Sequence, residues 1–157
     1  MGKEIKKCLI ISGAPESEIE SVSYTHLDVY KRQLLEYAVY NNCYYGTPIK
    51  GVNDAISNGK ICVLIIDVQG AENVKKLYPD SVSIFLVPPS WETLEQRLRA
   101  RNSEEEEMIQ KRLDIAKKEL LCQDEYDYKV VNDNLDDCVN DIEKILCEEL
   151  KKRNESK

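Results

Sequence analysis

The sequence predicts an α/β fold built on a central parallel sheet. Four short apolar runs without strict alternation are typical of parallel strands that are covered on both faces. Segments with helical spacing lie between and after these runs, which favours right-handed strand–helix–strand crossovers. With 157 residues, the chain has the size of one domain, expected to span 1–157. The predicted strands are Cys8–Ser12, Ile61–Asp67, Ser83–Val87 and Tyr128–Asn132.

Capping residues and apolar periodicity predict the helices. Asn58-Gly59 is a stop signal for a helix over Gly51–Ser57, and Pro79 follows a helix over Asn73–Tyr78. Ser90 is the expected N-cap of a helix over Trp91–Arg101. Two further amphipathic helices are expected. The first opens with a capping box at Ser103–Glu106 and carries Ile109, Leu113, Ala116 and Leu120 on one face. The second carries Ile142, Ile145 and Leu146. Residues 151–157, which follow it, are expected to fray.

Composition excludes several classes of function. The formal net charge of −7 argues against a nucleic-acid-binding protein, which needs a basic surface. No apolar run approaches the roughly 20 residues that span a membrane. The six cysteines form no C-x-x-C pair and His26 is the only histidine. We therefore expect a cytoplasmic protein with reduced thiols, no metal cluster of its own, and no nucleic-acid or membrane partner.

A tyrosine-rich block between Leu34 and Pro48 contains candidate binding residues. Glu36 is a lone carboxylate among hydroxyl groups that include those of Tyr45 and Thr47. A carboxylate can accept two N–H bonds from the edge of a guanine-like base, while hydroxyl groups donate to phosphate oxygens. A tyrosine-rich edge strand and hairpin without a ligand explains the same pattern.

Asp67 directly follows a predicted strand. In open α/β sheets, ligands bind at the carboxyl ends of the strands, which places Asp67 at the expected crevice. A strand-ending aspartate is also common as a helix cap or turn residue. Both interpretations of Asp67 stay open at this point.

Three arginines have spacing that suits a polyphosphate. Arg97 and Arg101 are one helical turn apart, and Arg112 lies on the next predicted helix. Guanidinium groups that converge across a helical hairpin can neutralise a phosphate chain, and an acidic connection could move as a lid. The alternative is a solvated hairpin whose arginines form ion pairs with Glu95, Glu104 or Glu105.

In combination, these blocks resemble the guanylate kinase family. The blocks that carry the resemblance are Leu35–Pro48, Asp67–Ala71, Pro88–Ser90 with the Arg97/Arg101 spacing, and Val131–Asp133. The resemblance implies a P-loop NTPase-like three-layer domain, with a small GMP-binding lobe at residues 34–48 and a lid hairpin at 97–112. The implied activity is the ATP- and Mg²⁺-dependent phosphorylation of GMP to GDP in purine nucleotide metabolism.

The resemblance also assigns roles to individual residues. Glu36, Tyr45, Thr47 and Asp67 match GMP-binding positions, with Glu36 as the guanine-reading carboxylate. The lid arginines that neutralise the transferring phosphoryl group correspond to Arg97, Arg101 and Arg112, and the ATP contacts to Asn132, Arg97 and Arg101.

The N-terminal part departs from the family and is expected to be incomplete. In the family, the first strand runs into a phosphate-binding loop. Gly13 matches the first glycine of that loop, but Glu18, Ile19 and Glu20 stand where glycine, lysine and serine or threonine are needed. Ile65 likewise stands where relatives usually carry an acidic residue. We therefore expect impaired ATP binding. A catalytically dead domain that binds phosphopeptides is the alternative.

Residues 16–33 form an atypical segment without strand or helix periodicity. Within it, Val22–Gln33 resembles a translated cloning adapter, so we hypothesise that it replaces the native first helix and that His26 has no role. An uninterrupted reading of this string in genomic DNA would contradict the hypothesis. A sheet face left without that helix predicts marginal stability or aggregation, which a cooperative thermal melt in the mesophile range would contradict.

Overall fold

The computed structural model describes the backbone of residues 8–13, 22–24, 34–40, 43–100 and 105–155, and the side chains of 47–100 and 105–152. The chain divides into two compact units. The first unit comprises Met1–Ser12 and Glu18–Ser83, and the second comprises Gly13–Ser17 and Ile84–Lys157. The single-domain organisation stays a prediction.

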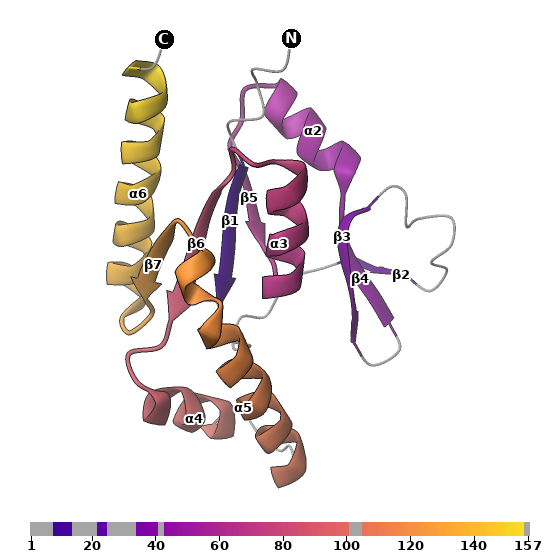
Figure 1. The fold of residues 1–157 in the computed structure, drawn as a ribbon, viewed down its shortest axis with the longest axis vertical. Helices are drawn as coiled ribbons and strands as arrows, with labels where there is room; N and C mark the ends of the chain where they lie inside the picture. Colours follow the sequence, from indigo (N-terminus) through magenta and orange to yellow (C-terminus); the bar gives the residue numbers. More distant parts are fainter. Residues whose placement is uncertain (1–7, 14–21, 25–33, 41–42, 101–104, 156–157) are drawn as a thin grey trace. The chain divides into compact units, whose positions relative to one another are not determined.

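Parallel strand pairs confirm the sheet that the apolar runs predicted (Figure 1). The strand order of this four-stranded sheet is β5-β1-β6-β7. In the first unit, β1 pairs with β5 from Cys8↔Cys62 to Ile11↔Ile65; in the second, β6 pairs with β7 from Ile84↔Tyr128 to Val87↔Val131. The strand bounds are Cys8–Gly13 (β1), Cys62–Ile65 (β5), Val82–Val87 (β6) and Tyr128–Val131 (β7).

Burial differs between the strands of this sheet. Ile84 and Phe85 of β6 are fully buried, as a strand covered on both faces requires. Val63 and Ile65 of β5 are 49% and 48% exposed, and Val131 of β7 is 52% exposed. The side chains of β5 and β7 are therefore less covered than those of β6. These are the edge strands of the sheet, and among the described helices α2 contacts β5 and α6 contacts β7.

A second sheet, antiparallel and three-stranded, lies in the first unit with the order β2-β4-β3. Strands β3 (Leu34–Tyr40) and β4 (Cys43–Pro48) form the hairpin that the tyrosine-rich block suggested. Strand β2 (Val22–Tyr24) pairs with β4, although it belongs to the segment without periodicity. Hydrogen bonds to a neighbouring strand can hold a short extended segment whose own pattern does not predict it.

The described part of the first unit also contains two helices, α2 (Ile49–Ser57) and α3 (Val68–Leu77). The stop after α2 lies where the sequence placed it. Gly59 adopts a φ of 72°, and its N–H donates to the Ile56 carbonyl at 3.0 Å. This left-handed conformation favours glycine because it has no Cβ. Helix α3 begins earlier than the predicted start at Asn73 because a capping residue precedes Val68.

A helical hairpin in the second unit consists of α4 (Trp91–Ala100) and α5 (Glu106–Leu121). The expected N-cap of α4 is confirmed, since Ser90 Oγ accepts from the Thr93 N–H at 3.1 Å. The capping box at Ser103 is wrong: Glu105 is the N-cap of α5, and Ser103 lies outside the described residues. The two helices share a buried cluster of Leu94, Leu98, Ile109, Leu113 and Ala116, with Trp91 and Leu120 packed against it.

The C-terminal helix α6 (Leu135–Glu155) contacts β7. It continues to Glu155, so the fraying expected of residues 151–157 is wrong for 151–155, and residues 156–157 lie outside the described residues. The Lys152 ammonium donates to Tyr128 Oη at 3.0 Å and to Glu149 Oε1 at 2.9 Å, and the Tyr128 hydroxyl donates to the same carboxylate. These bonds attach the last turns of the helix to the strand.

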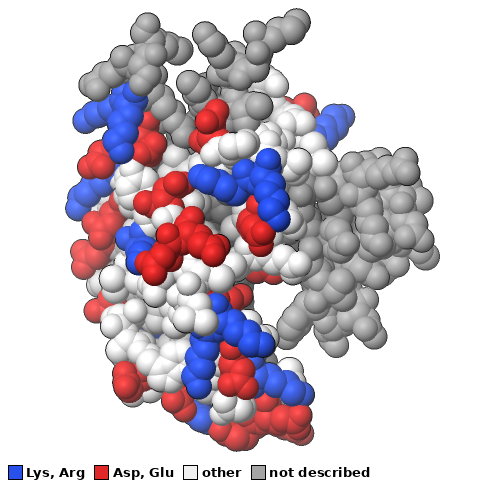
Figure 2. Space-filling view, viewed as in Figure 1, with Lys and Arg blue, Asp and Glu red and all other residues white. Residues whose placement is uncertain are grey.

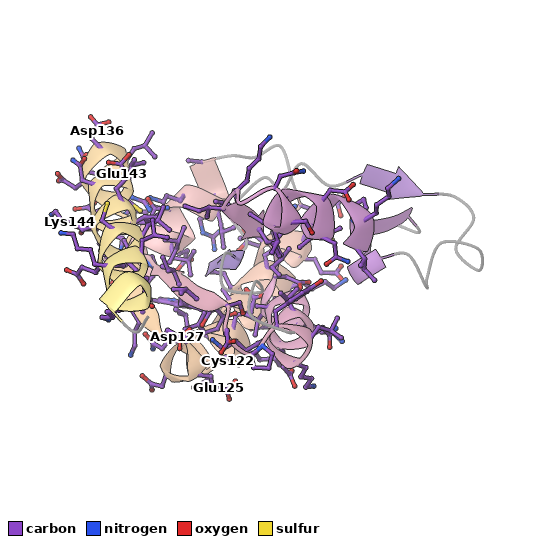
Figure 3. The ribbon with its side chains drawn as sticks, turned by 90° about the horizontal axis from the view of Figure 1, so that it is seen from above. Cys122, Glu125, Asp127, Asp136, Glu143 and Lys144 are labelled. Atoms are coloured by element: carbon purple, nitrogen blue, oxygen red, sulfur yellow. The ribbon has the colours of Figure 1, made fainter. Side chains whose placement is uncertain are left out.

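Exposed charged residues occur along α6 and around the turn that precedes β7. Figure 3 shows Asp136, Glu143 and Lys144 on α6, and Cys122, Glu125 and Asp127 around the turn after α5, where a short 3₁₀ helix (η1, Gln123–Glu125) lies.

Among the helices of the described residues, none has the length and apolar character needed to cross a membrane.

Candidate functional site

The hairpin of β3 and β4 brings three of the predicted binding positions together. Glu36 lies directly opposite Thr47, and Ala38 lies opposite Tyr45. Because alternate residues of a strand share a face and cross-strand partners face the same way, the positions of Glu36, Tyr45 and Thr47 fall on one face of the hairpin. Thr47 is half-buried. The clustering that a shared ligand requires is therefore present in the strand register.

Asp67 has the local role that the alternative interpretation gave it. Its side chain caps α3: the Gly70 N–H donates to Asp67 Oδ1 at 2.7 Å, and the Ala71 N–H donates to the Asp67 carbonyl at 2.8 Å. An ionised carboxylate offers about four acceptor positions, so a cap does not exhaust its capacity. Helix α3 contacts β3, the strand that carries Glu36. All four predicted GMP-binding residues thus belong to the first unit.

Arg97 lies against another predicted ATP-binding residue. Its Nη1 donates to the Asn132 carbonyl at 2.6 Å, and its Nη2 donates to the Asp133 carbonyl at 3.3 Å. Nη2 also lies 3.9 Å from Asp133 Oδ1, and the Arg97 side chain is 30% exposed. The structure therefore joins α4 to the turn after β7. Arg112 is half-buried on α5, and Arg101 lies outside the described residues.

Arg99, which the sequence did not indicate as a candidate, forms ion pairs with two glutamates of this hairpin. Arg99 binds Glu95 Oε1 at 2.9–3.0 Å, and it binds both carboxylate oxygens of Glu106 at 2.6 and 2.8 Å. Hydrogen bonds from Arg99 lower the pKa of Glu106. The same bonds raise the already high pKa of Arg99.

The ion-pair interpretation is confirmed at Glu95, whose described partner is Arg99. Arg101 and Glu104 lie outside the described residues, so ion pairs that involve them stay predictions. The i,i+4 spacing of Glu95 and Arg99 was the available signal. Figure 2 shows acidic and basic side chains interspersed over the region of α4 and α5.

A protein-held metal site is not formed by the residues whose placement the structure gives. Within that part of the chain, no group of three or more histidine, cysteine, aspartate or glutamate residues could hold a metal ion. Ile65, at the position where an acidic residue was expected, is an apolar side chain that is 48% exposed. The phosphate-loop positions Glu18, Ile19 and Glu20 lie outside the described residues.

Comparison with known proteins connects these features to one family. The family model described as Guanylate kinase matches residues 20–149. A guanylate kinase of Carboxydothermus hydrogenoformans is 44% identical over 140 residues, which cover 84% of this chain and 68% of that protein. The guanylate kinase of Desulfitobacterium hafniense is 48% identical over 117 residues, which cover 74% of this chain but only 58% of that protein.

A solved structure is similar over nearly the whole chain. The crystal structure of guanylate kinase from Anaplasma phagocytophilum matches with a TM-score of 0.70 and 25% sequence identity, covering 99% of this chain and 96% of that one. The similarity confirms the predicted α/β, P-loop NTPase-like fold with parallel strands. Together with the family match over residues 20–149, it shows that this chain belongs to the guanylate kinase family.

Proposed function

We propose that this chain binds GMP and ATP, and that its reaction is the transfer of the γ-phosphoryl group of ATP to GMP. A phosphate oxygen of GMP attacks the γ-phosphorus, the bond to the β,γ-bridging oxygen breaks, and GDP and ADP result. One observation carries the proposal: the family match over residues 20–149 contains both the Glu36 hairpin and the arginine-bearing helices. A role in cytoplasmic purine nucleotide metabolism is part of the same proposal.

The acceptor GMP is assigned to the first unit. The Glu36 carboxylate accepts N–H bonds from the guanine edge, as a charged acceptor can do for two donors at once. Thr47, directly opposite in the register, and Tyr45, on the same face, donate to phosphate oxygens. Asp67 adds a second carboxylate, at the start of a helix that contacts β3. The cross-strand register supports this assignment, because one ligand needs its contacts on one face.

The donor ATP is assigned to the second unit. Asn132 contacts the adenine, and Arg97 and Arg112, together with Arg101, supply positive charge for the phosphates. Phosphoryl transfer depends on positioning and on charge neutralisation, for which arginine is well suited because it binds phosphate in a bidentate way. The direct contact between Arg97 and Asn132 supports a shared site for these two residues.

Mg²⁺ enters this proposal with ATP and not as a resident ion. The described residues offer no cluster of ligands for it, and Ile65 cannot coordinate a cation. Mg²⁺ bound to the phosphates of ATP would neutralise their charge. We assign no step of the transfer to a protein–metal contact.

We further propose that ATP binding and turnover are impaired. Carboxylates at positions 18 and 20 and an isoleucine at position 19 replace the residues that hold polyphosphate in a P-loop. Backbone amides and a lysine provide most of the attraction for phosphate in such loops, whereas carboxylates repel it. The expected phenotype is GMP binding with weak or absent formation of ADP and GDP.

Calorimetric titration with GMP tests the acceptor site, and a coupled assay for ADP release tests turnover. Glu36→Gln keeps the size of the side chain and removes its charge, so we expect a loss of about 10- to 100-fold in GMP affinity. Glu148→Gln, an exposed change on α6, is the matched control and should leave GMP affinity unchanged.

Absence of GMP binding to the unmodified chain would contradict the proposal. Binding of a phosphoserine peptide without nucleotide binding would instead establish the alternative of a phosphopeptide-binding domain. ADP release at the rate of an intact kinase would contradict the proposed impairment.

A further inference from the structure

Three sets of hydrogen bonds hold the turn between β7 and α6. On one side, the Asn132 N–H donates to the carbonyl of Val87, at the end of β6, at 2.8 Å. On the next, the Asn134 side chain caps α6 by accepting from the Asp137 N–H at 3.2 Å. On the third, Arg97 of α4 donates to the carbonyls of residues 132 and 133. The Arg97 contact is the only one of these three that reaches the turn through a long, charged side chain.

A guanidinium group is suited to this contact in a way that other side chains are not. It is planar and presents several N–H donors in a fixed fork, so it can hold two successive carbonyls at once. A lysine at the same position would supply a single point charge and could not fix the orientation of both peptide groups. The bond to the Asn132 carbonyl is part-buried, which partly shields it from competition by water, whereas the bond to the Asp133 carbonyl is exposed. Arg97 therefore holds the carbonyl side of the turn at residues 132 and 133, while the Asn132 N–H is held by Val87.

The side chain of Asn132 has the chemistry to distinguish nucleotide bases. A carboxamide carries one donor group and one acceptor, and adenine presents the complementary pair in its 6-amino group and a neighbouring ring nitrogen. Hypoxanthine, the base of ITP, has an oxygen in place of the 6-amino group and loses that donor. Because a half-turn of the amide group exchanges its donor and its acceptor, discrimination between the two bases requires the turn to hold this side chain closely; a mobile turn would let it adapt to either base.

We propose that Arg97 is a positioning residue that acts through Asn132: by fixing the backbone of the β7–α6 turn, it sets the preference of the donor site for ATP over nucleotides with another base. This inference rests on the proposed assignment of ATP to the second unit. It changes the role expected for Arg97 from neutralising the phosphate to orienting a contact with the base. The two carbonyl contacts on the turn carry this reassignment.

Calorimetric titration of the full chain with ATP and with ITP distinguishes a role of Arg97 at the base from a role at the phosphates. We expect Arg97→Ala to weaken ATP binding about tenfold and ITP binding little, so that the ratio of the two affinities falls about tenfold. Arg97→Lys should recover part of the ratio, because it restores one donor. Arg99→Ala is the matched control on the same helix; its partners are Glu95 and Glu106, and it should leave the ratio unchanged.

Hydrogen exchange at the Asn132 amide provides a reading that does not involve nucleotide. We expect faster exchange at this amide in Arg97→Ala than in Arg99→Ala, since only the first variant releases the turn. GMP affinity should be the same in both variants, because the residues assigned to GMP belong to the other unit.

Several outcomes would overturn the inference. Equal weakening of ATP and ITP in Arg97→Ala would assign Arg97 to the phosphates and leave the proposed function intact. A lack of preference for ATP over ITP in the unmodified chain, or unchanged amide exchange in Arg97→Ala, would remove the positioning role. Binding of GMP without any binding of ATP would also overturn it, whereas absence of both would refute the proposed function itself.

Discussion

Asp67 is the residue at which a structural role and a binding role are easiest to separate. Its carboxylate caps α3 through a 2.7 Å bond from the Gly70 N–H, and it is also a predicted GMP ligand. Asparagine caps helices as well as aspartate does, whereas alanine cannot cap. Asp67→Asn therefore removes the charge and keeps the cap, and Asp67→Ala removes both.

The expected magnitudes follow from these two roles. Asp67→Ala should lower the free energy of unfolding by about 1–2 kcal/mol, because it loses both the cap and the charge at the start of the helix. Asp67→Asn should cost about 0.3–1 kcal/mol, because only the favourable charge at the start of the helix is lost. If guanine N–H groups bind the carboxylate, loss of a charge-assisted hydrogen bond worth about 1.5–3 kcal/mol weakens GMP binding about 10- to 150-fold in both variants.

Calorimetry with GMP, combined with urea unfolding of the same samples, measures both quantities. The matched control is Asn134→Ala, which removes the side-chain cap of α6 and should cost a similar free energy of unfolding without changing GMP affinity. Wild-type GMP affinity in Asp67→Asn would refute the binding role and leave Asp67 as a helix cap alone.

Three further predictions concern the second unit. Leu94→Ala should lower the free energy of unfolding by about 3–5 kcal/mol, since Leu94 is fully buried between α4 and α5; urea unfolding followed by the fluorescence of Trp91 measures it. Glu106→Gln should remove the stabilisation that the Arg99 contact provides. Because that contact lowers the pKa of Glu106, the stabilisation is complete above the ordinary carboxyl pKa and is lost as the pH falls through the lowered pKa. Thermal melts of both proteins at a series of pH values measure it. Cys138 should react with a disulfide reagent more slowly than the exposed Cys147, because burial raises its pKa.

Each of these predictions has a contradicting result. A Leu94→Ala loss below about 1 kcal/mol would mean that the helical hairpin does not depend on its buried cluster. Melting temperatures of wild type and Glu106→Gln that differ by the same amount at pH 3 and pH 7 would remove the contribution of the Arg99 contact. Equal labelling rates of Cys138 and Cys147 would show that the first helical turns of α6 open readily.

The local elements were predictable from the sequence because their signals are short-range. The stop at Gly59, the N-cap at Ser90 and the stripe that contains Ile109 and Leu113 each depend on neighbours within a few residues. For strand β2, which the sequence did not predict, a distant partner decided the outcome. Strand β2 exists through its pairing with β4, although its own residues have no periodicity.

For the candidate site, the residue types were visible in the sequence and their grouping was not. The sequence alone identified a carboxylate and hydroxyl groups in one block and arginines in another, together with their resemblance to one family. Only the tertiary structure placed Glu36 opposite Thr47 and brought Arg97 to the turn at Asn132. The physical reason is that chemical type is a property of each residue, whereas strand register and the partner of a long side chain depend on segments that are far apart in the chain.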